Sequence, residues 1–243
     1  MKQESKMASD NLIIEAFTGS HLYGTECPDS DIDLVGIFIP TKEYVLGVKR
    51  CDQVNLSNFE NLVITDYTCY SLIKYIHLAI QNNPNIISLF YTPRNRIKYI
   101  NIFGEDLIKN RNLFLSKKCY HTFRGYAHQQ KRKMLLQNRE GKRKDDVEKF
   151  GFDPKFAMHL MRLYYECLEL MVAGEITYPS PNRVLLKQIR EGEKSLEWIF
   201  GESERLETLI DEAYVKSDLQ HSSDIKKIEE LQISMLEMCW KVL

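Results

Sequence analysis

Asp31 and Asp33 open a short apolar stretch that ends at Pro40, and this pair of acids constrains the chain more than any other feature. Alternate residues of a β-strand point to the same face, so the two carboxylates are expected side by side. Like charges at this spacing repel each other and destabilise a strand unless something positive lies between them. The stretch therefore predicts a strand that begins beside a bound cation.

Two further elements belong with this pair. Residues 11–19 are apolar and β-branched, which predicts a strand, and they end at Gly19-Ser20, where backbone N–H groups and the Ser20 hydroxyl can receive phosphate oxygens. Residues 61–67 predict a third strand that carries Asp66. Oxygen ligands of this kind favour Mg²⁺, with Mn²⁺ as the alternative. A third carboxylate would allow two ions to bind about 4 Å apart.

The strand signals fade after about residue 105, and helical spacing replaces them. We therefore expect an α+β fold with two domains, residues 1–112 around a mixed sheet and residues 113–243 entirely helical. The charged stretch 141–152 is expected to be an exposed loop, and residues 85–92 a short helix or strand. Periodicity and end signals predict helices over residues 69–81, 116–139, 154–173, 182–192, 195–217 and 223–243.

Charge is unevenly distributed in a chain whose formal net charge is −1. The segment from Lys117 to Lys149 holds eleven Lys and Arg against four Asp and Glu, which favours contact with a polyanion such as RNA. The alternative is a solvated helix face that pairs with the acidic helices after Glu191. Its aromatic residues Tyr120, Phe123 and Tyr126 recur at helical spacing, which favours core packing over stacking on bases.

The cysteines and the hydropathy indicate the compartment. None of the six cysteines lies in a CxxC or zinc-type pattern, so we expect buried free thiols and a reducing, cytoplasmic setting. No apolar run approaches the roughly 20 residues of a membrane span, and no membrane partner is expected.

The motifs together resemble a known family. The spacing of "GSHLYGTECPDSDIDLVGIF" is similar to that of the DNA polymerase β-like nucleotidyltransferase superfamily, and within it to the predicted nucleotidyltransferases of the RlaP type. The resemblance extends from Gly19 to Ile199 through "DYTCYSLIKYIHLAIQNNPNIISLF", "FRGYAHQQKRKM", "KFAMHLMRLYYECLELMVAGEI" and "NRVLLKQIREGEKSLEWI". One departure is Phe156, where the family often has His.

The resemblance implies a fold, a reaction and a set of site residues. It implies a nucleotidyltransferase-type sheet with flanking helices, followed by a helical domain that closes the nucleotide cleft. The implied reaction is metal-dependent transfer of a nucleoside monophosphate from a nucleoside triphosphate such as ATP to an acceptor hydroxyl. The implied catalytic and metal-binding residues are Asp31, Asp33 and Asp66, and the implied nucleotide-binding residues are Gly19, Ser20, Lys155, His159 and Arg162.

The acceptor is left open by the sequence. The basic segment favours an RNA or tRNA end, while a protein or a small molecule is the alternative acceptor. A third hypothesis is a regulatory protein that binds nucleotides without catalysis. The presence of all three acids argues against it.

A polar stripe on the predicted helix 154–173 has two interpretations. Lys155, His159, Arg162, Glu166 and Glu169 fall on one face of that helix. The stripe is either solvent-facing, with Arg162 and Glu166 paired one turn apart, or its basic end faces the triphosphate.

Overall fold

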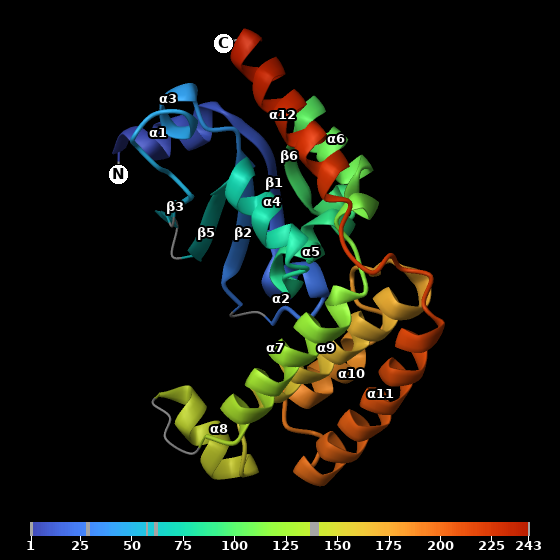
Figure 1. The fold of residues 1–243 in the computed structure, drawn as a ribbon. Coiled ribbons are helices and arrows are strands. Elements are labelled where there is room, and N and C mark those ends of the chain that lie inside the picture. Colours follow the sequence, from blue (N-terminus) through green and yellow to red (C-terminus); the bar gives the residue numbers. More distant parts are fainter. Residues whose placement is uncertain (1, 28–29, 57, 61–62, 137–140, 243) are drawn as a thin grey trace. The chain divides into compact units, whose positions relative to one another are not determined.

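The computed structural model describes residues 2–27, 30–56, 58–60, 63–136 and 141–242. The chain forms two compact units (Figure 1). The first combines Met1–Leu115 with Ser223–Leu243, and the second is Ser116–Ser222. The expected division at residue 112 lies three residues from this boundary, but the last helix, expected in the helical domain, is part of the first unit.

A mixed β-sheet forms the centre of the first unit. Its strand order is β3-β5-β2-β1-β6, and β4 also pairs with β5. The β2–β5 pair is parallel and the other pairs are antiparallel, which confirms the expected mixed sheet. The expected turn at residues 28–29 lies outside the described residues. The strands are β1 (Leu12–Thr18), β2 (Ile32–Phe38), β3 (Gln53–Asn55), β4 (Asn58–Glu60), β5 (Val63–Ser71) and β6 (Ile97–Ile100).

Helices flank this sheet, and α4 lies across it in the view of Figure 1. The helix predicted over residues 69–81 begins only at Leu72, because Cys69 and Tyr70 still belong to β5 and the Ser71 hydroxyl accepts a hydrogen bond from the backbone N–H of Lys74. The helices are α1 (Lys2–Asp10), α2 (Gly19–Tyr23), α3 (Lys42–Val45), α4 (Leu72–Ile80), α5 (Pro84–Ile87), α6 (Ile102–Lys109) and α12 (Ile225–Val242), with 3₁₀ turns at Ser88–Tyr91, Arg94–Arg96 and Arg111–Leu113.

One face of the sheet is covered by α1. Met7 and Ala8 of this helix pack in one buried cluster with Phe38 of β2 and Cys69 of β5. Side chains alternate along a strand, so residues an odd number of positions from Phe38 and Cys69 point to the opposite face. This alternation decides which face carries Asp33 and Asp66.

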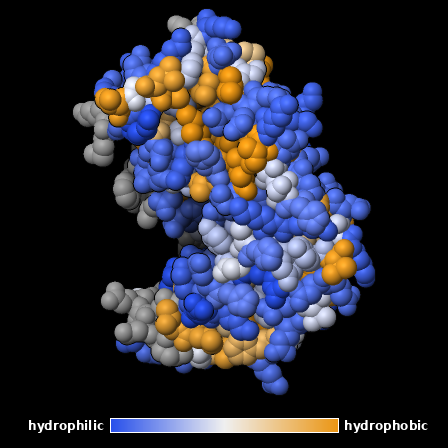
Figure 2. Space-filling view, in the orientation of Figure 1, coloured by the Kyte–Doolittle hydropathy of each residue, from blue (hydrophilic) through white to orange (hydrophobic). Residues whose placement is uncertain are grey.

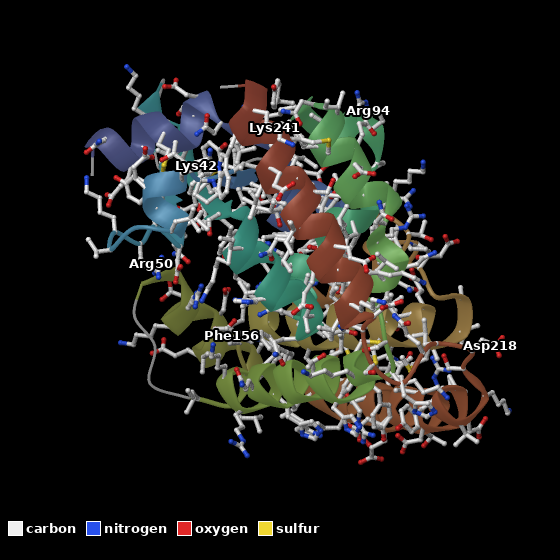
Figure 3. The ribbon with its side chains drawn as sticks, turned by 45° about the horizontal axis from the view of Figure 1, so that its top comes forward. Lys42, Arg50, Arg94, Phe156, Asp218 and Lys241 are labelled. Atoms are coloured by element: carbon white, nitrogen blue, oxygen red, sulfur yellow. The ribbon has the colours of Figure 1, made fainter. Side chains whose placement is uncertain are left out.

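The last helix, α12, returns to the first unit through specific contacts. The Ser223 hydroxyl donates to the carbonyl of Phe114 at 2.6 Å just before the helix. Near its other end, the indole N–H of Trp240 donates to the carbonyl of Pro40 at 2.9 Å. The ammonium of Lys42, labelled in Figure 3, lies 5.7 Å from the centroid of the same indole ring. These contacts hold α12 in the first unit, rather than in the helical unit where it was expected.

The second unit is entirely helical in its described residues, as expected. Its most extensive helix–helix contacts join α9 to α7, α11 and α10. In the view of Figure 2, the surface of this unit combines hydrophilic areas with smaller hydrophobic patches. The helices are α7 (Lys118–Met134), α8 (Lys142–Phe150), α9 (Pro154–Ala173), α10 (Arg183–Arg190) and α11 (Leu196–Lys216).

The residues at the two ends of α9 predicted its bounds correctly. Asp153 caps the helix by accepting from the backbone N–H groups of Lys155 and Phe156, Pro154 occupies its first position, and Gly174 ends it in the left-handed conformation. The predicted Ser116 cap of α7 is wrong, because that side chain is buried and the helix begins at Lys118.

The loop predicted over residues 141–152 is also wrong, because most of it is helix α8. Val147 is buried and anchors the helix, while Lys144 and Glu148 pair on its exposed side at 3.7 Å. Gly151 ends it with a φ of 81°. The high charge of this stretch indicated exposure, and its two apolar residues, Val147 and Phe150, gave too little periodicity to reveal the helix.

The six cysteines are free thiols, of which four are buried and two partly buried. Across the described part of the chain, no helix combines the length and hydropathy needed to span a bilayer.

Candidate functional site

The structure brings Asp33 and Asp66 together. These residues are register partners on the parallel strands β2 and β5, so their side chains leave the same face of the sheet on adjacent strands. That face is opposite the one covered by α1, because Asp33 lies five positions from Phe38 and Asp66 three positions from Cys69. The strand register thus places Asp66, thirty-three residues downstream, on the same face as Asp33, and its role in a site stays a prediction.

Gly19 lies directly against the carboxylate of Asp33. It follows Thr18, the antiparallel register partner of Asp33, and has a φ of 60°. A Cβ atom on Gly19 would lie only 2.0 Å from Oδ2 of Asp33. The backbone can approach the carboxylate this closely because the residue is glycine.

Ser20 and Asp31 complete the surroundings predicted from the sequence. Ser20 is the second residue of the short helix α2, and its backbone carbonyl accepts a hydrogen bond from the Thr25 N–H at 3.0 Å. Asp31 immediately precedes β2 and is exposed, as is Asp66. Gly19-Ser20 and Asp31 thus lie at adjoining ends of β1 and β2, and Asp66 lies within the neighbouring strand β5.

The donor set fits a divalent cation held by two carboxylates. Asp33 and Asp66 offer oxygen ligands on one face, and a cation such as Mg²⁺ commonly takes one or two carboxylates and completes its shell with phosphate oxygens and water. In the described part of the chain, no three His, Cys, Asp or Glu side chains form a group that could hold a metal ion. Asp31 is therefore not gathered with Asp33 and Asp66, and the three-acid, two-ion arrangement stays a prediction.

The second unit gathers basic residues around His159. Burial lowers the pKa of His159 well below its ordinary value of 6.5, and the positive charges of Arg162, Lys155, Arg190 and Arg143 lower this pKa further. These cations come from α8, α9 and α10. Arg143 and Arg190 were not anticipated from the sequence, in which nothing relates them to Lys155.

Arg162 and Glu166 form a buried ion pair. The Arg162 guanidinium donates to both carboxylate oxygens at 2.9 and 2.7 Å, and both side chains are at most 5% exposed. Tyr178 adds a hydrogen bond to Glu166 at 3.0 Å. Burial raises the pKa of Glu166, and Arg162 and Tyr178 oppose that shift. The predicted pairing is confirmed, but the solvent-facing interpretation is wrong.

Of the three aromatic residues of α7, one lies in the core, as predicted for all three, and the other two are partly buried. Phe123 is fully buried. The ring of Tyr120 lies 4.3 Å from that of Tyr214, and its hydroxyl donates to Asp211 at 2.7 Å. Tyr126 is partly buried.

The cations of α7 divide into two groups. Arg124 forms an ion pair with Asp211 of α11 at 2.6 Å, and Lys131 lies 5.0 Å from the ring centroid of Phe200. Arg132 and Lys133 are exposed, and the Lys133 ammonium lies 5.7 Å from the ring centroid of Phe156. Pairing with the acidic helices therefore accounts for part of the basic segment, and part of it is presented on the surface.

Comparison with known proteins places this geometry in context. Residues 1–237 match the model of the family RlaP, described as an RNA repair pathway DNA polymerase beta family. A protein of Enterobacteria phage T4, the "uncharacterized 38.9 kDa protein in nrdC-mobD intergenic region", is 33% identical over 86 residues, which are 33% of this chain and 26% of that protein. The match thus spans about a quarter of this relative.

Two solved structures are similar to the chain over most of its length. One is a nucleotidyltransferase-like protein from Exiguobacterium sibiricum 255-15, with 11% identity, a TM-score of 0.34 and coverage of 88% of this chain and 73% of that chain. The other is spectinomycin adenyltransferase AAD(9) from Enterococcus faecialis with ATP and spectinomycin, with 13% identity, a TM-score of 0.41 and coverage of 96% and 94%.

Proposed function

Because this chain belongs to the RlaP family of DNA polymerase β-type nucleotidyltransferases, we propose that it transfers a nucleoside monophosphate from a nucleoside triphosphate to an acceptor hydroxyl. The observation that carries the proposal is the register of Asp33 with Asp66, beside the close approach of Gly19. These features place paired carboxylates next to a backbone turn that can receive phosphate groups.

Each residue has a distinct task in the proposed reaction. Asp33 and Asp66 hold Mg²⁺, or Mn²⁺ as the alternative, and the Ser20 hydroxyl donates to a phosphate oxygen of the nucleotide. When bound, the cation supplies positive charge that stabilises the negative charge on the phosphate oxygens. The exposed Asp66 carboxylate also accepts the proton of the acceptor hydroxyl. The acceptor oxygen forms a bond to the α-phosphorus, and the bond to pyrophosphate breaks.

Removing the carboxylates tests the proposal. With labelled triphosphate, Mg²⁺ and total cellular RNA, Asp33→Asn and Asp66→Asn should each lower transfer by at least roughly a hundredfold, because a metal ligand is lost. Asp52→Asn is the matched control, since Asp52 is an exposed acid of the same unit before β3. Chelation with EDTA should abolish transfer and added Mg²⁺ should restore it. Full activity of either site variant would contradict the assignment.

We propose an RNA end as the acceptor, supported by the exposed cations at the end of α7. Charge reversal of Lys131, Arg132 and Lys133 should weaken RNA binding and reduce its salt dependence, because fewer counterions are released. Equal RNA affinity of the wild type and the triple variant at low salt would favour a protein or small-molecule acceptor. Triphosphate binding without transfer to any acceptor would favour the hypothesis of a regulatory protein without catalysis.

A further inference from the structure

A groove lies between α9 and α11 within the second unit. Near one end of this helix pair, the Ser203 hydroxyl donates to the sulfur of Met161 at 3.6 Å. Ten residues further along each helix, Met171 and Ala213 line one cavity of about 400 Å³. The two helices, labelled in Figure 1, therefore run parallel, and the cavity lies towards the carboxyl-terminal ends of both. Its walls are mostly apolar, with Leu168, Met171 and Val172 from α9 and Leu209 and Ala213 from α11.

Apolar side chains remain exposed along this groove. Val172 lines the cavity and is 72% exposed, and Val215 of α11 is 79% exposed. Leu168 and Leu209, on the two walls, are only partly buried. A single exposed apolar residue is ordinary, whereas several beside a cavity are typical of an interaction surface. Covering them removes apolar surface from water, which is the main favourable contribution to protein association.

Two opposite charges stand on the α11 wall of the groove. Glu212 and Lys216 both line the cavity, both are exposed, and they lie one turn apart on the helix. The ion pairs of the described residues include neither of them. An occupant that complements this wall therefore carries a positive and a negative charge at the same spacing and in the reverse order.

We propose that a second copy of this chain occupies the groove, so that the protein forms a two-fold symmetric dimer through α9 and α11. In a two-fold interface one surface meets itself, so residue i of one copy contacts residue j of the other, and j contacts i. Antiparallel α11 helices place Glu212 of one copy against Lys216 of the partner subunit, and the converse. The wall thus supplies its own complement. This inference concerns assembly and stands apart from the proposed reaction.

The apolar residues and the charges contribute differently to this dimer. Val172 and Val215 are exposed in the single copy, and their burial in both copies supplies affinity. Ion pairs at an exposed rim add little affinity. They do select the antiparallel orientation, because parallel α11 helices would bring like charges together.

A charge-swap series tests the arrangement in the full-length protein. Sedimentation velocity should show the wild type passing from monomer to dimer as its concentration rises. Glu212→Lys and Lys216→Glu should each weaken self-association by at least roughly tenfold, because like charges then meet twice in the interface. The double variant with both substitutions should restore self-association, since the two charges are only exchanged. Glu204→Lys is the matched control, because Glu204 is an exposed acid of α11 that does not line the cavity.

An equimolar mixture of the two single variants tests the same contacts in another way. The Glu212→Lys copy carries two positive charges at the groove, and the Lys216→Glu copy carries two negative ones. The mixture should therefore form a dimer with one copy of each, at concentrations where either variant alone is monomeric.

The apolar contribution has its own variant and control. Val172→Gln should weaken self-association by roughly tenfold, because an apolar side chain is lost from each copy. Val184→Gln should leave it unchanged, since Val184 is a valine of α10, 66% exposed, that does not line the cavity.

Three results would overturn the proposal. A monomer at every concentration up to about 100 μM would leave the groove to a different protein or to a small apolar molecule. A dimer that neither charge variant weakens would form through another surface. Weakened single variants without recovery in the double variant and in the mixture would show that Glu212 and Lys216 do not face each other across the interface.

Discussion

Gly19→Ala tests the closest contact of the candidate site. The added Cβ would lie 2.0 Å from Oδ2 and 2.9 Å from Cγ of Asp33, and the residue would keep a φ of 60° that L-amino acids rarely adopt. The substitution thus combines backbone strain with displacement of a carboxylate from its place on β2.

The two contributions can be estimated separately. Left-handed backbone strain costs about 1–2 kcal/mol for a residue with a side chain. Forcing an atom into an occupied space costs about 1–3 kcal/mol more. Gly19→Ala should therefore destabilise the protein by about 2–5 kcal/mol. Gly151→Ala is the matched control, because its φ is 81° but no atom lies within 4 Å of its Cβ, so only the strain remains.

A double-mutant cycle measured by urea unfolding isolates the contact. Asp33→Ala removes Oδ2 and Cγ and leaves only Cβ, which lies 3.1 Å from the new methyl group. In that background Gly19→Ala should cost about 1–3 kcal/mol less than in the wild type, and Gly151→Ala should cost the same in both. Equal costs for Gly19→Ala with and without the carboxylate would refute the placement of Asp33 against the Gly-Ser turn.

Three further predictions concern the second unit. Arg162→Ala should cost about 3–5 kcal/mol in urea unfolding by leaving Glu166 buried without its cation. The loss should be greater at pH 8 than at pH 5, since the raised pKa of Glu166 favours its protonated form in the folded state; a cost below about 1 kcal/mol would contradict the buried pair. The lowered pKa of His159 means that the unfolded state binds its proton more readily, so stability should fall as pH drops below 6.5. His159→Gln should reduce this acid sensitivity of the melting temperature, and an unchanged pH dependence would count against the burial of the ring. Gly125→Ala, at an exposed position within α7 with no atom within 4 Å, should stabilise the protein by about 0.5–1 kcal/mol in the same unfolding assay; a destabilised variant would show that the methyl group meets an obstacle.

Features that depend on neighbours in the sequence were predictable. Both ends of α9 follow from Asp153-Pro154 and Gly174, because caps and left-handed glycines act over a few bonds. The strand that carries Asp33, and the helical character of the second unit, follow from the period of the apolar residues. The membership of the family also follows from motifs that are short and local.

Features that depend on packing were not predictable from the same signals. The spacing of Arg162 and Glu166 indicated a pair, but the sequence cannot show that Tyr178 and the helices around α9 exclude water from it. The return of α12 to the sheet depends on contacts such as that of Trp240 with Pro40, which are two hundred residues apart. Helix α8 forms around the single buried residue Val147, too weak a signal for periodicity to detect.

The candidate site also combines features that the sequence predicts with features that depend on packing. The sequence alone determined that Gly19, Asp33 and Asp66 are residue types suited to phosphate and cations, and that each lies on or beside a strand. The register of Asp66 with Asp33, and the contact of Gly19 with the Asp33 carboxylate, follow from the folded sheet. Alternation within a strand is fixed by local backbone geometry, whereas register between strands is fixed by the burial of whole faces, which only the folded sheet provides.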